Sequence, residues 1–210
     1  MGEYIRARSA EHKRERMDAI MAAADKLFQT HPYHCITMGT IADELGWSRS
    51  NLYKYAATQE EIFLALHSAK NRAYLQDLEA KLAGVPLPPD EFARIWAQVT
   101  GQHGDFLRYQ DIVIAIIESN VTFERLVEFK REFKEILDPI VDVLVRQCGV
   151  SAEQAADLYL RLLFQAPGLY NHYHCAEKTL EAMKAAGLDG AKGTFEEAYA
   201  DFVHLCISRA

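Results

Sequence analysis

Six polar side chains crowd into one short stretch that follows a glycine. Residues 48–54 read Ser-Arg-Ser-Asn-Leu-Tyr-Lys and come directly after IADELGW. Short hydroxyl and amide groups form hydrogen bonds with base edges, arginine binds guanine or phosphate, and lysine binds phosphate. This mixture of residue types is therefore suited to contact a nucleic acid.

The residues around this stretch predict a helix-turn-helix. Thr37 and Ser48 are suitable N-caps for two short helices, and Gly46 stands between them where the turn requires a positive φ. Small Ala42 lies where the two helix backbones must approach closely. The apolar residues that complete the inner face are Ile41, Leu45, Trp47, Leu52 and Tyr55.

In such a motif the second helix lies in the major groove, with its N-terminal residues at the base edges. We assign Tyr55 to the core, whereas Tyr53 is predicted to lay its ring along the sugar–phosphate wall and to donate its hydroxyl to a phosphate. A tight helical hairpin inside an ordinary core would show the same spacing, so that alternative stays open on these positions alone. The residues predicted to contact DNA are Thr37, Thr40, Ser48, Arg49, Ser50, Asn51, Tyr53 and Lys54.

Composition favours a folded protein with a sizeable core. Of the 210 residues, 50% are hydrophobic and 25% are charged, which is typical of a globular chain. The charged residues 1–16 are not typical of a secretory signal, and no stretch is apolar enough to span a membrane. Four widely spaced cysteines predict small buried hydrophobic residues, with no disulfide framework. We therefore expect a cytoplasmic protein.

Charge is unevenly distributed along the chain. The net charge is −7, which argues against a protein that coats nucleic acid without specificity. Residues 1–60 contain equal numbers of basic and acidic side chains, so the whole negative charge lies in 61–210. The first quarter of the chain is therefore the part that repels a polyanion least.

Nearly every apolar pattern has the helical period, so the sequence predicts an all-α fold. An amphipathic helix is expected from Met17 to Phe28, and capping boxes begin at Thr58 and Thr194. Pro139 is expected to kink one helix, and Pro167-Gly168 is expected to interrupt another. We place a domain boundary near residue 56.

The segment ITMGTIADELGWSRSNLYKYAATQEEIFLAL resembles the N-terminal domain of the TetR family of bacterial transcriptional repressors. The match extends from about His12 to Leu66. Two positions depart from the family pattern, because Ala56 replaces a common phenylalanine and Gln59 replaces a lysine that typically contacts phosphate. Without that lysine, phosphate affinity is expected to depend more on Lys54, Arg49 and the basic N-terminal residues.

The resemblance implies a division of labour along the chain. Residues 10–56, with the motif at 37–56, would form a three-helix DNA-binding domain, and 57–210 would form a larger helical ligand-binding and dimerisation domain. Family members are homodimers that pair through their last two helices. The implied function is a transcriptional regulator, most simply a repressor that leaves a near-palindromic double-stranded DNA operator when a small-molecule effector binds. The alternative is an all-helical ligand-binding or scaffold protein that does not bind DNA.

The middle of the chain supplies candidates for the effector pocket. Apolar walls with a few polar tips suit an organic ligand and equally suit an ordinary core. No catalytic motif and no convincing set of metal ligands is present, so no enzyme activity, cofactor or metal is expected. The candidate pocket residues are Trp96, His103, Phe106, Tyr109, Phe129, Phe133, Tyr170 and His174.

Overall fold

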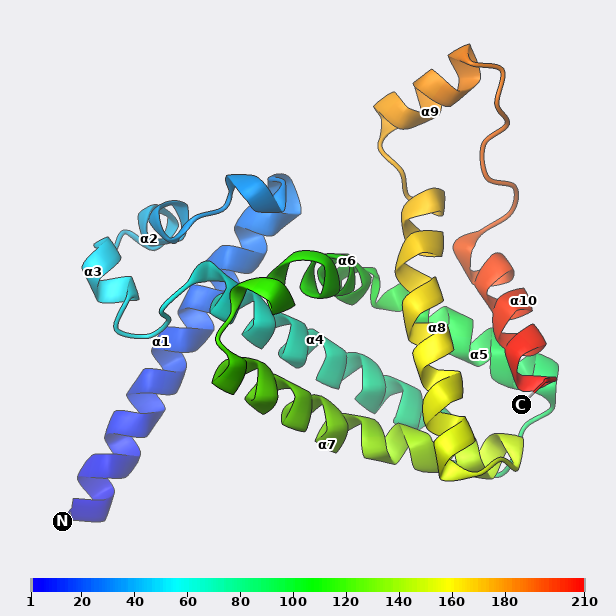
Figure 1. Cartoon of the computed structure of the whole chain (residues 1–210), viewed down its shortest axis with the longest axis horizontal. Coiled ribbons are helices and arrows are strands. Elements are labelled where there is room, and N and C mark those ends of the chain that lie inside the picture. Colours follow the sequence, from blue (N-terminus) through cyan, green and yellow to red (C-terminus); the bar gives the residue numbers. More distant parts are fainter. Residues whose placement is uncertain (1, 210) are drawn as a thin grey trace. The chain divides into compact units, whose positions relative to one another are not determined.

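The computed structural model describes the backbone of residues 2–209 and the side chains of residues 11–209. Within that range the chain forms ten α-helices and no β-strand, so the all-α prediction is confirmed (Figure 1). The elements in chain order are α1 (Gly2–Thr30), η1 (Tyr33–Cys35), α2 (Met38–Leu45), α3 (Arg49–Leu52), α4 (Gln59–Leu82), α5 (Pro89–Gln102), α6 (Gly104–Ile112), η2 (Val113–Ile117), η3 (Glu118–Asn120), α7 (Phe123–Cys148), α8 (Ala152–Tyr173), α9 (Glu177–Ala185) and α10 (Phe195–Ile207).

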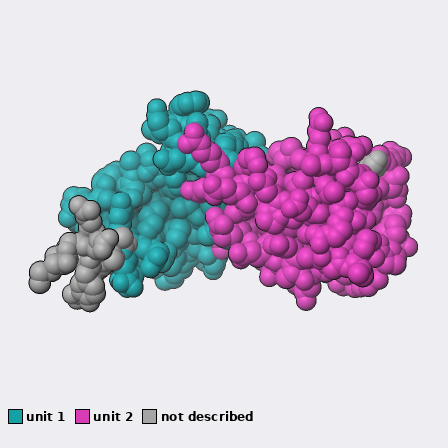
Figure 2. All heavy atoms as spheres, turned by 90° about the horizontal axis from the view of Figure 1, so that it is seen from below, with its two compact units in different colours: residues 1–69, 112–130 teal, residues 70–111, 131–210 magenta. Residues whose placement is uncertain are grey.

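The chain divides into two compact units, which Figure 2 shows in different colours. Unit 1 comprises residues 1–69 and 112–130, and unit 2 comprises 70–111 and 131–210. Unit 1 contains the predicted helix-turn-helix.

An aromatic cluster holds unit 1 together. The ring of Phe63 in α4 lies edge-on to Phe28 of α1 at 5.4 Å and to Tyr33 of η1 at 4.9 Å. The hydroxyl of Tyr33 donates to Glu60 Oε1 at 3.1 Å. Burial raises the pKa of Tyr33 to about 12, so its hydroxyl stays protonated and remains a donor. These contacts fix the start of α4 against α1 and η1 by apolar packing and one polar contact.

A larger aromatic core fills unit 2. Its biggest fully buried side chains include Trp96 of α5, Tyr159 of α8 and Tyr199 of α10. Helix α10 packs along α5 and α8, and the hydroxyl of Tyr199 donates to the carbonyl of Leu162 at 2.8 Å. Unit 2 therefore brings its last helix onto α5 and α8 through apolar packing and a buried hydrogen bond.

Capping predictions are confirmed at Thr194 and are half right at Thr58. Thr194 forms a reciprocal capping box with Glu197. Thr58 Oγ1 accepts from the backbone N–H of Glu61, as predicted, at 3.3 Å. The Glu61 carboxylate, however, accepts from the N–H of Ala57 at 2.8 Å and not from Thr58. The Glu61 side chain is long enough to reach the N–H of Ala57, one residue before the predicted donor.

Two predicted helix boundaries are wrong. Helix α1 begins at Gly2, well before Met17, because residues 2–16 are rich in good helix formers but lack an apolar stripe that would reveal them. Helix α8 continues through Pro167 to Tyr173. The proline ring is buried, so apolar packing offsets the loss of one backbone hydrogen bond.

Other expectations have mixed outcomes. Among the described residues, no helix combines the length and apolar character that crossing a bilayer requires. All four cysteines are free, but the prediction that they are buried is wrong. Cys35 is exposed, and the other three are only partly buried. Pro139 lies inside α7, and the kink expected there stays a prediction.

Two helical glycines in unit 2 should respond oppositely to alanine. A Cβ at Gly104 would collide with the hydroxyl and ring of Tyr170, which is itself packed on His174 and Phe195. We expect Gly104→Ala to lower the free energy of unfolding by about 1–3 kcal/mol. Gly168→Ala, where a Cβ meets no atom within 4 Å, should raise it by up to about 1 kcal/mol. Urea denaturation measures both, and equal effects would contradict the described packing.

Candidate nucleic-acid interface

Helix α2 starts with a reciprocal cap made by two threonines. Thr37 Oγ1 accepts from the backbone N–H of Thr40 at 3.2 Å, and Thr40 Oγ1 accepts from the N–H of Thr37 at 2.9 Å. Each side chain therefore satisfies a donor that the first helical turn leaves open. The predicted N-cap at Thr37 is confirmed.

The turn after α2 has the backbone that the sequence predicts. Gly46 adopts φ 65° and ψ 29°, in the left-handed region. The N–H of Trp47 donates to the carbonyl of Ala42 at 2.8 Å, which closes the end of the helix. A side chain at residue 46 would make this conformation costly.

Helix α3 has only four residues, so its neighbours must stabilise it. Ser48 caps it by accepting from the N–H of Asn51 at 3.3 Å. Leu52 is 0% exposed and anchors the helix in the core of unit 1. Tyr55 is half-buried, and its ring lies 6.0 Å from that of Trp47. The residues assigned to the inner face thus pack inward.

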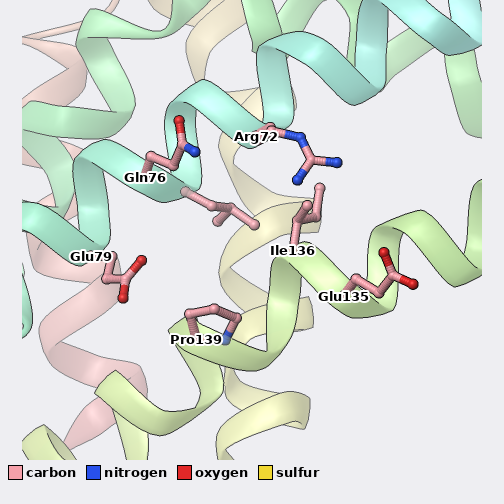
Figure 3. Close-up of a pocket in the computed structure, with 7 residues that line it drawn as sticks. Arg72, Gln76, Glu79, Glu135, Ile136 and Pro139 are labelled. Atoms are coloured by element: carbon pink, nitrogen blue, oxygen red, sulfur yellow. The ribbon is translucent and has the colours of Figure 1, made fainter. Parts of the chain in front are cut away.

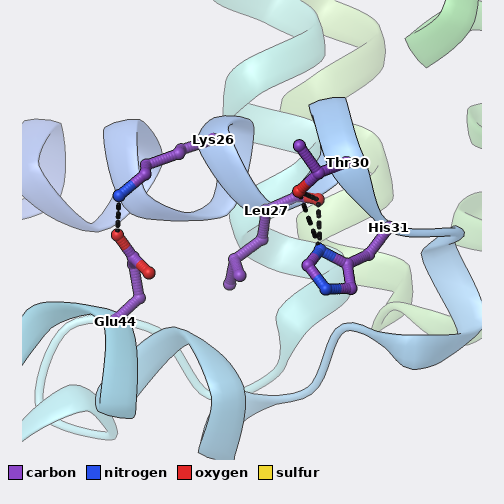
Figure 4. Close-up of polar contacts among 5 residues, drawn as sticks. All are labelled: Lys26, Leu27, Thr30, His31 and Glu44. Atoms are coloured by element: carbon purple, nitrogen blue, oxygen red, sulfur yellow. Dashed lines mark hydrogen bonds and ion pairs between the residues drawn. The ribbon is translucent and has the colours of Figure 1, made fainter.

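Helix α1 braces the motif through two contacts that the sequence analysis missed. Lys26 Nζ lies 2.5 Å from Glu44 Oε1 of α2 (Figure 4). The guanidinium carbon of Arg16 lies 5.0 Å from the centre of the Trp47 ring, a cation–π arrangement. Figure 4 also shows Thr30 and His31, which close the end of α1. The charges on α1 were visible in the sequence, but their partners lie too far along the chain to be paired by spacing.

The predicted DNA-contacting residues lie together in unit 1, and most of them face solvent. Tyr53 is 54% exposed, and only Asn51 is partly buried. Among the described residues, the side chains of Arg49, Tyr53 and Lys54 have no hydrogen-bond or ion-pair partner, so their side-chain donors are available. The exposed members of the set are Thr37, Thr40, Ser48, Arg49, Ser50, Tyr53 and Lys54.

The hydroxyl groups of the motif differ in what they can still donate. Thr40 Oγ1 donates its proton to the carbonyl of Thr37 at 3.0 Å. Thr37 Oγ1 only accepts, so its proton is free for an external acceptor such as a phosphate. Ser48 and Ser50 share a hydrogen bond at 3.1 Å. Thr37 is therefore better suited than Thr40 to donate to DNA.

The other predicted contributors to phosphate binding have different outcomes. Gln59 is half-buried, and its side-chain amide lies beside the hydroxyl of Tyr33. Burial raises the pKa of Tyr33, and the hydrogen bond with Gln59 offsets part of that rise. Lys13 and Arg14 are exposed on α1. The side chains of Arg6 and Arg8 lie outside the described residues.

The candidate pocket residues fall into both units. Phe129 is buried in unit 1. In unit 2, Trp96, Phe106 and Tyr109 are buried, His103, Phe133 and Tyr170 are half-buried, and His174 is exposed with its ring stacked on Tyr170 at 3.9 Å. Among residues 11–209, no three His, Cys, Asp or Glu side chains are grouped as metal ligands. The role of the candidate pocket residues in binding an effector stays a prediction.

A shallow hollow on unit 2 lies between α4 and α7 (Figure 3). Its volume of about 130 Å³ is below the roughly 300 Å³ at which small-molecule pockets begin. None of the candidate pocket residues lines it. The lining residues are Arg72, Leu75, Gln76, Glu79, Glu135, Ile136 and Pro139.

Two family profiles match almost the whole chain. Residues 20–66 match the profile described as bacterial regulatory proteins of the tetR family. Residues 68–208 match the tetracyclin repressor-like C-terminal domain. No curated protein has a sequence that matches this chain.

Solved structures with low sequence identity share the fold. A TetR/AcrR-family regulator from Thermobifida fusca is 17% identical, with a TM-score of 0.58 over 92% of this chain and 97% of that one. The fatty acid degradation regulator FadR from Bacillus halodurans is 16% identical, with a TM-score of 0.54 over 91% and 94%. The regulator PfmR from Thermus thermophilus is 18% identical, with a TM-score of 0.52 over 90% and 97%.

Gly46 and Gly84 both have room for a Cβ, so alanine substitutions at these positions isolate the effect of backbone strain. A Cβ would meet no atom within 4 Å at Gly46 or at Gly84, but only Gly46 has a positive φ. We expect Gly46→Ala to lower the free energy of unfolding by about 1 kcal/mol, since alanine is strained in that region. Gly84→Ala should be neutral or slightly stabilising. Urea denaturation measures both, and a neutral Gly46→Ala would refute the left-handed turn.

Proposed function

The chain belongs to the TetR family of DNA-binding transcriptional regulators, and from that premise we propose that it is a homodimeric repressor released from its operator by a small molecule. Residues 10–56 would bind DNA, and 57–210 would bind the effector and dimerise. The protein would act in the cytoplasm. Each protomer would place residues 48–54 in one major groove, so the operator would be a near-palindrome.

One observation carries this proposal. Leu52 of α3 is completely buried, while the side chains of Arg49, Tyr53 and Lys54 stay exposed without hydrogen-bond or ion-pair partners among the described residues. Desolvating charged and hydrogen-bonding groups is costly, so a protein leaves them unpaired where solvent or a ligand satisfies them. Three such groups on one short turn match the requirements of a groove-binding surface.

The side chains differ in what they would recognise. Arg49 presents a planar fork of donors that fits guanine in the major groove, and Asn51 fits adenine. Lys54 is a flexible point charge that suits phosphate, and Tyr53 would donate its hydroxyl to the same backbone. We therefore assign sequence preference to Arg49 and Asn51, and sequence-independent affinity to Tyr53 and Lys54.

This assignment predicts two distinct phenotypes. Lys54→Ala should weaken binding to all sequences similarly and reduce the slope of log K against log salt by about one. Arg49→Ala should remove the preference at one base pair by roughly 5- to 100-fold, the value of one bidentate contact. Fluorescence anisotropy with operator variants at several salt concentrations measures both. Lys184→Ala on α9 is the charge-matched control and should leave both quantities unchanged.

The assignment fails if the two variants behave alike. Lys54→Ala must not change the ranking of operator variants, and Arg49→Ala must change it. Wild-type protein that binds all sequences equally would contradict the proposed regulator itself.

We infer that dimerisation uses the exposed face of α8 and α10. Phe164 of α8 is 57% exposed, and Leu205 of α10 is 45% exposed. Large exposed apolar side chains on neighbouring helices are typical of a protein interface. A stable dimer needs about 1,200–2,000 Å² of buried surface, and two long helices per protomer can supply it.

Charges on this face should separate the protomers. Phe164→Glu combined with Leu205→Glu would bury two carboxylates in each half of the interface, so we expect a monomer at micromolar concentration. Sedimentation velocity measures the mass. Val85→Glu, at a side chain 78% exposed in the loop before α5, is the control and should remain dimeric. A double variant that keeps the dimer mass would place the interface elsewhere.

Buried polar groups in unit 2 support an effector site there. The hydroxyl of Tyr159 and the amide of Asn71 are buried without hydrogen-bond partners among the described residues. Burial and the neighbouring Tyr74 hold the pKa of Tyr159 well above its usual value, so its hydroxyl stays a donor. Such groups are satisfied when a ligand supplies polar atoms.

Effector binding would act on DNA by population shift. A ligand that favours the DNA-incompetent state by about 1–3 kcal/mol weakens operator binding roughly 5- to 150-fold. A compound that binds tightly yet leaves operator affinity unchanged would contradict this part of the proposal.

A further inference from the structure

Gly39 in the first turn of α2 is buried although its helix lies at the surface. The Arg49 side chain covers it. A Cβ added at Gly39 would lie 2.7 Å from Arg49 Nη2 and 3.0 Å from both Cζ and Nε. Three guanidinium atoms at similar distances indicate that the planar group lies flat against the glycine.

The backbone gives no other reason for a glycine at this position. Gly39 is not among the glycines with positive φ, which are Gly46, Gly149, Gly187 and Gly193. Within a helix, glycine is less favourable than alanine because it loses more conformational freedom on folding. The space taken by the Arg49 guanidinium is thus the structural feature that explains the absence of a side chain.

This contact restricts where Arg49 can point. One face of the guanidinium lies on α2, while its N–H groups have no partner among the described residues. Glu44, which is also on α2, pairs with Lys26. A side chain held in one direction before binding loses less conformational freedom when it forms its contacts. The arginine is therefore directed before DNA arrives.

We propose that Gly39 is a positioning residue for Arg49 and thereby determines operator preference. This inference depends on the proposed DNA-reading role of Arg49. Any side chain at residue 39 would displace the guanidinium from α2, because the group it meets is the flexible end of the arginine. The fold would be retained, and the direction of Arg49 would change.

A double-mutant cycle tests this inference. Wild type, Gly39→Ala, Arg49→Ala and the double variant would be titrated against the operator and against variants at each base pair. We expect Gly39→Ala to reduce preference by roughly 5- to 100-fold at the base pair where Arg49→Ala does. The double variant should match Arg49→Ala alone, because no guanidinium remains to be displaced. Gly84→Ala, which adds a methyl group in open space, should behave as wild type.

Thermal unfolding separates positioning from damage to the fold. Gly39→Ala should keep or raise the melting temperature, because alanine favours the helix, while operator preference falls. Unchanged preference in Gly39→Ala would overturn the inference. So would an equal effect of Gly39→Ala in the Arg49→Ala background. If wild-type protein itself shows no preference among sequences, the proposed function fails before Gly39 is tested.

Discussion

The burial of Leu52 is the constraint on which the DNA-facing surface depends. A helix of four residues cannot persist alone, because its nucleation costs more than its few hydrogen bonds return. Leu52 is 0% exposed, so apolar burial holds α3 in place. Burial of this one side chain also leaves its polar neighbours, Arg49, Tyr53 and Lys54, at the surface. Burial of Leu52 therefore both anchors α3 and exposes the polar side chains that we propose bind DNA.

The surroundings of α3 turn this anchor into a defined surface. Ser48 caps the helix and Gly46 turns the chain into it. The pair Lys26–Glu44 and the stack of Arg16 on Trp47 hold α1 against the motif. Exposed ion pairs contribute little stability each, so we attribute to them orientation more than energy. In our proposal Gly39 has the same effect on one side chain, because it orients Arg49 before DNA binds.

Local signals in the sequence predicted this region well. Local features depend on a few neighbouring residues, so the sequence is sufficient to predict them. The caps at Thr37 and Ser48 and the turn at Gly46 are of this kind. The failures have two different causes. Pro167 stays helical because its ring is buried, and α1 extends to Gly2 through good helix formers that show no apolar stripe.

Contacts between distant residues could not be read from spacing. Nothing in the sequence around Gly39 indicates that the side chain of Arg49 covers it. The pocket candidates remain predictions for a related reason, because aromatic residues form a core and a pocket with the same pattern. The division between residues 10–56 and 57–210 likewise remains our proposal.

Selective recovery of genomic DNA shows whether this chain binds a specific operator through the surface around α3. Purified wild-type protein and a Tyr53→Ala, Lys54→Ala double variant would each be incubated with genomic fragments at near-physiological salt, and the bound fragments sequenced. If residues 48–54 of a dimer bind DNA, wild type alone should enrich a short near-palindrome. Featureless recovery by both proteins, repeated after unfolding and refolding to strip any bound ligand, would contradict it.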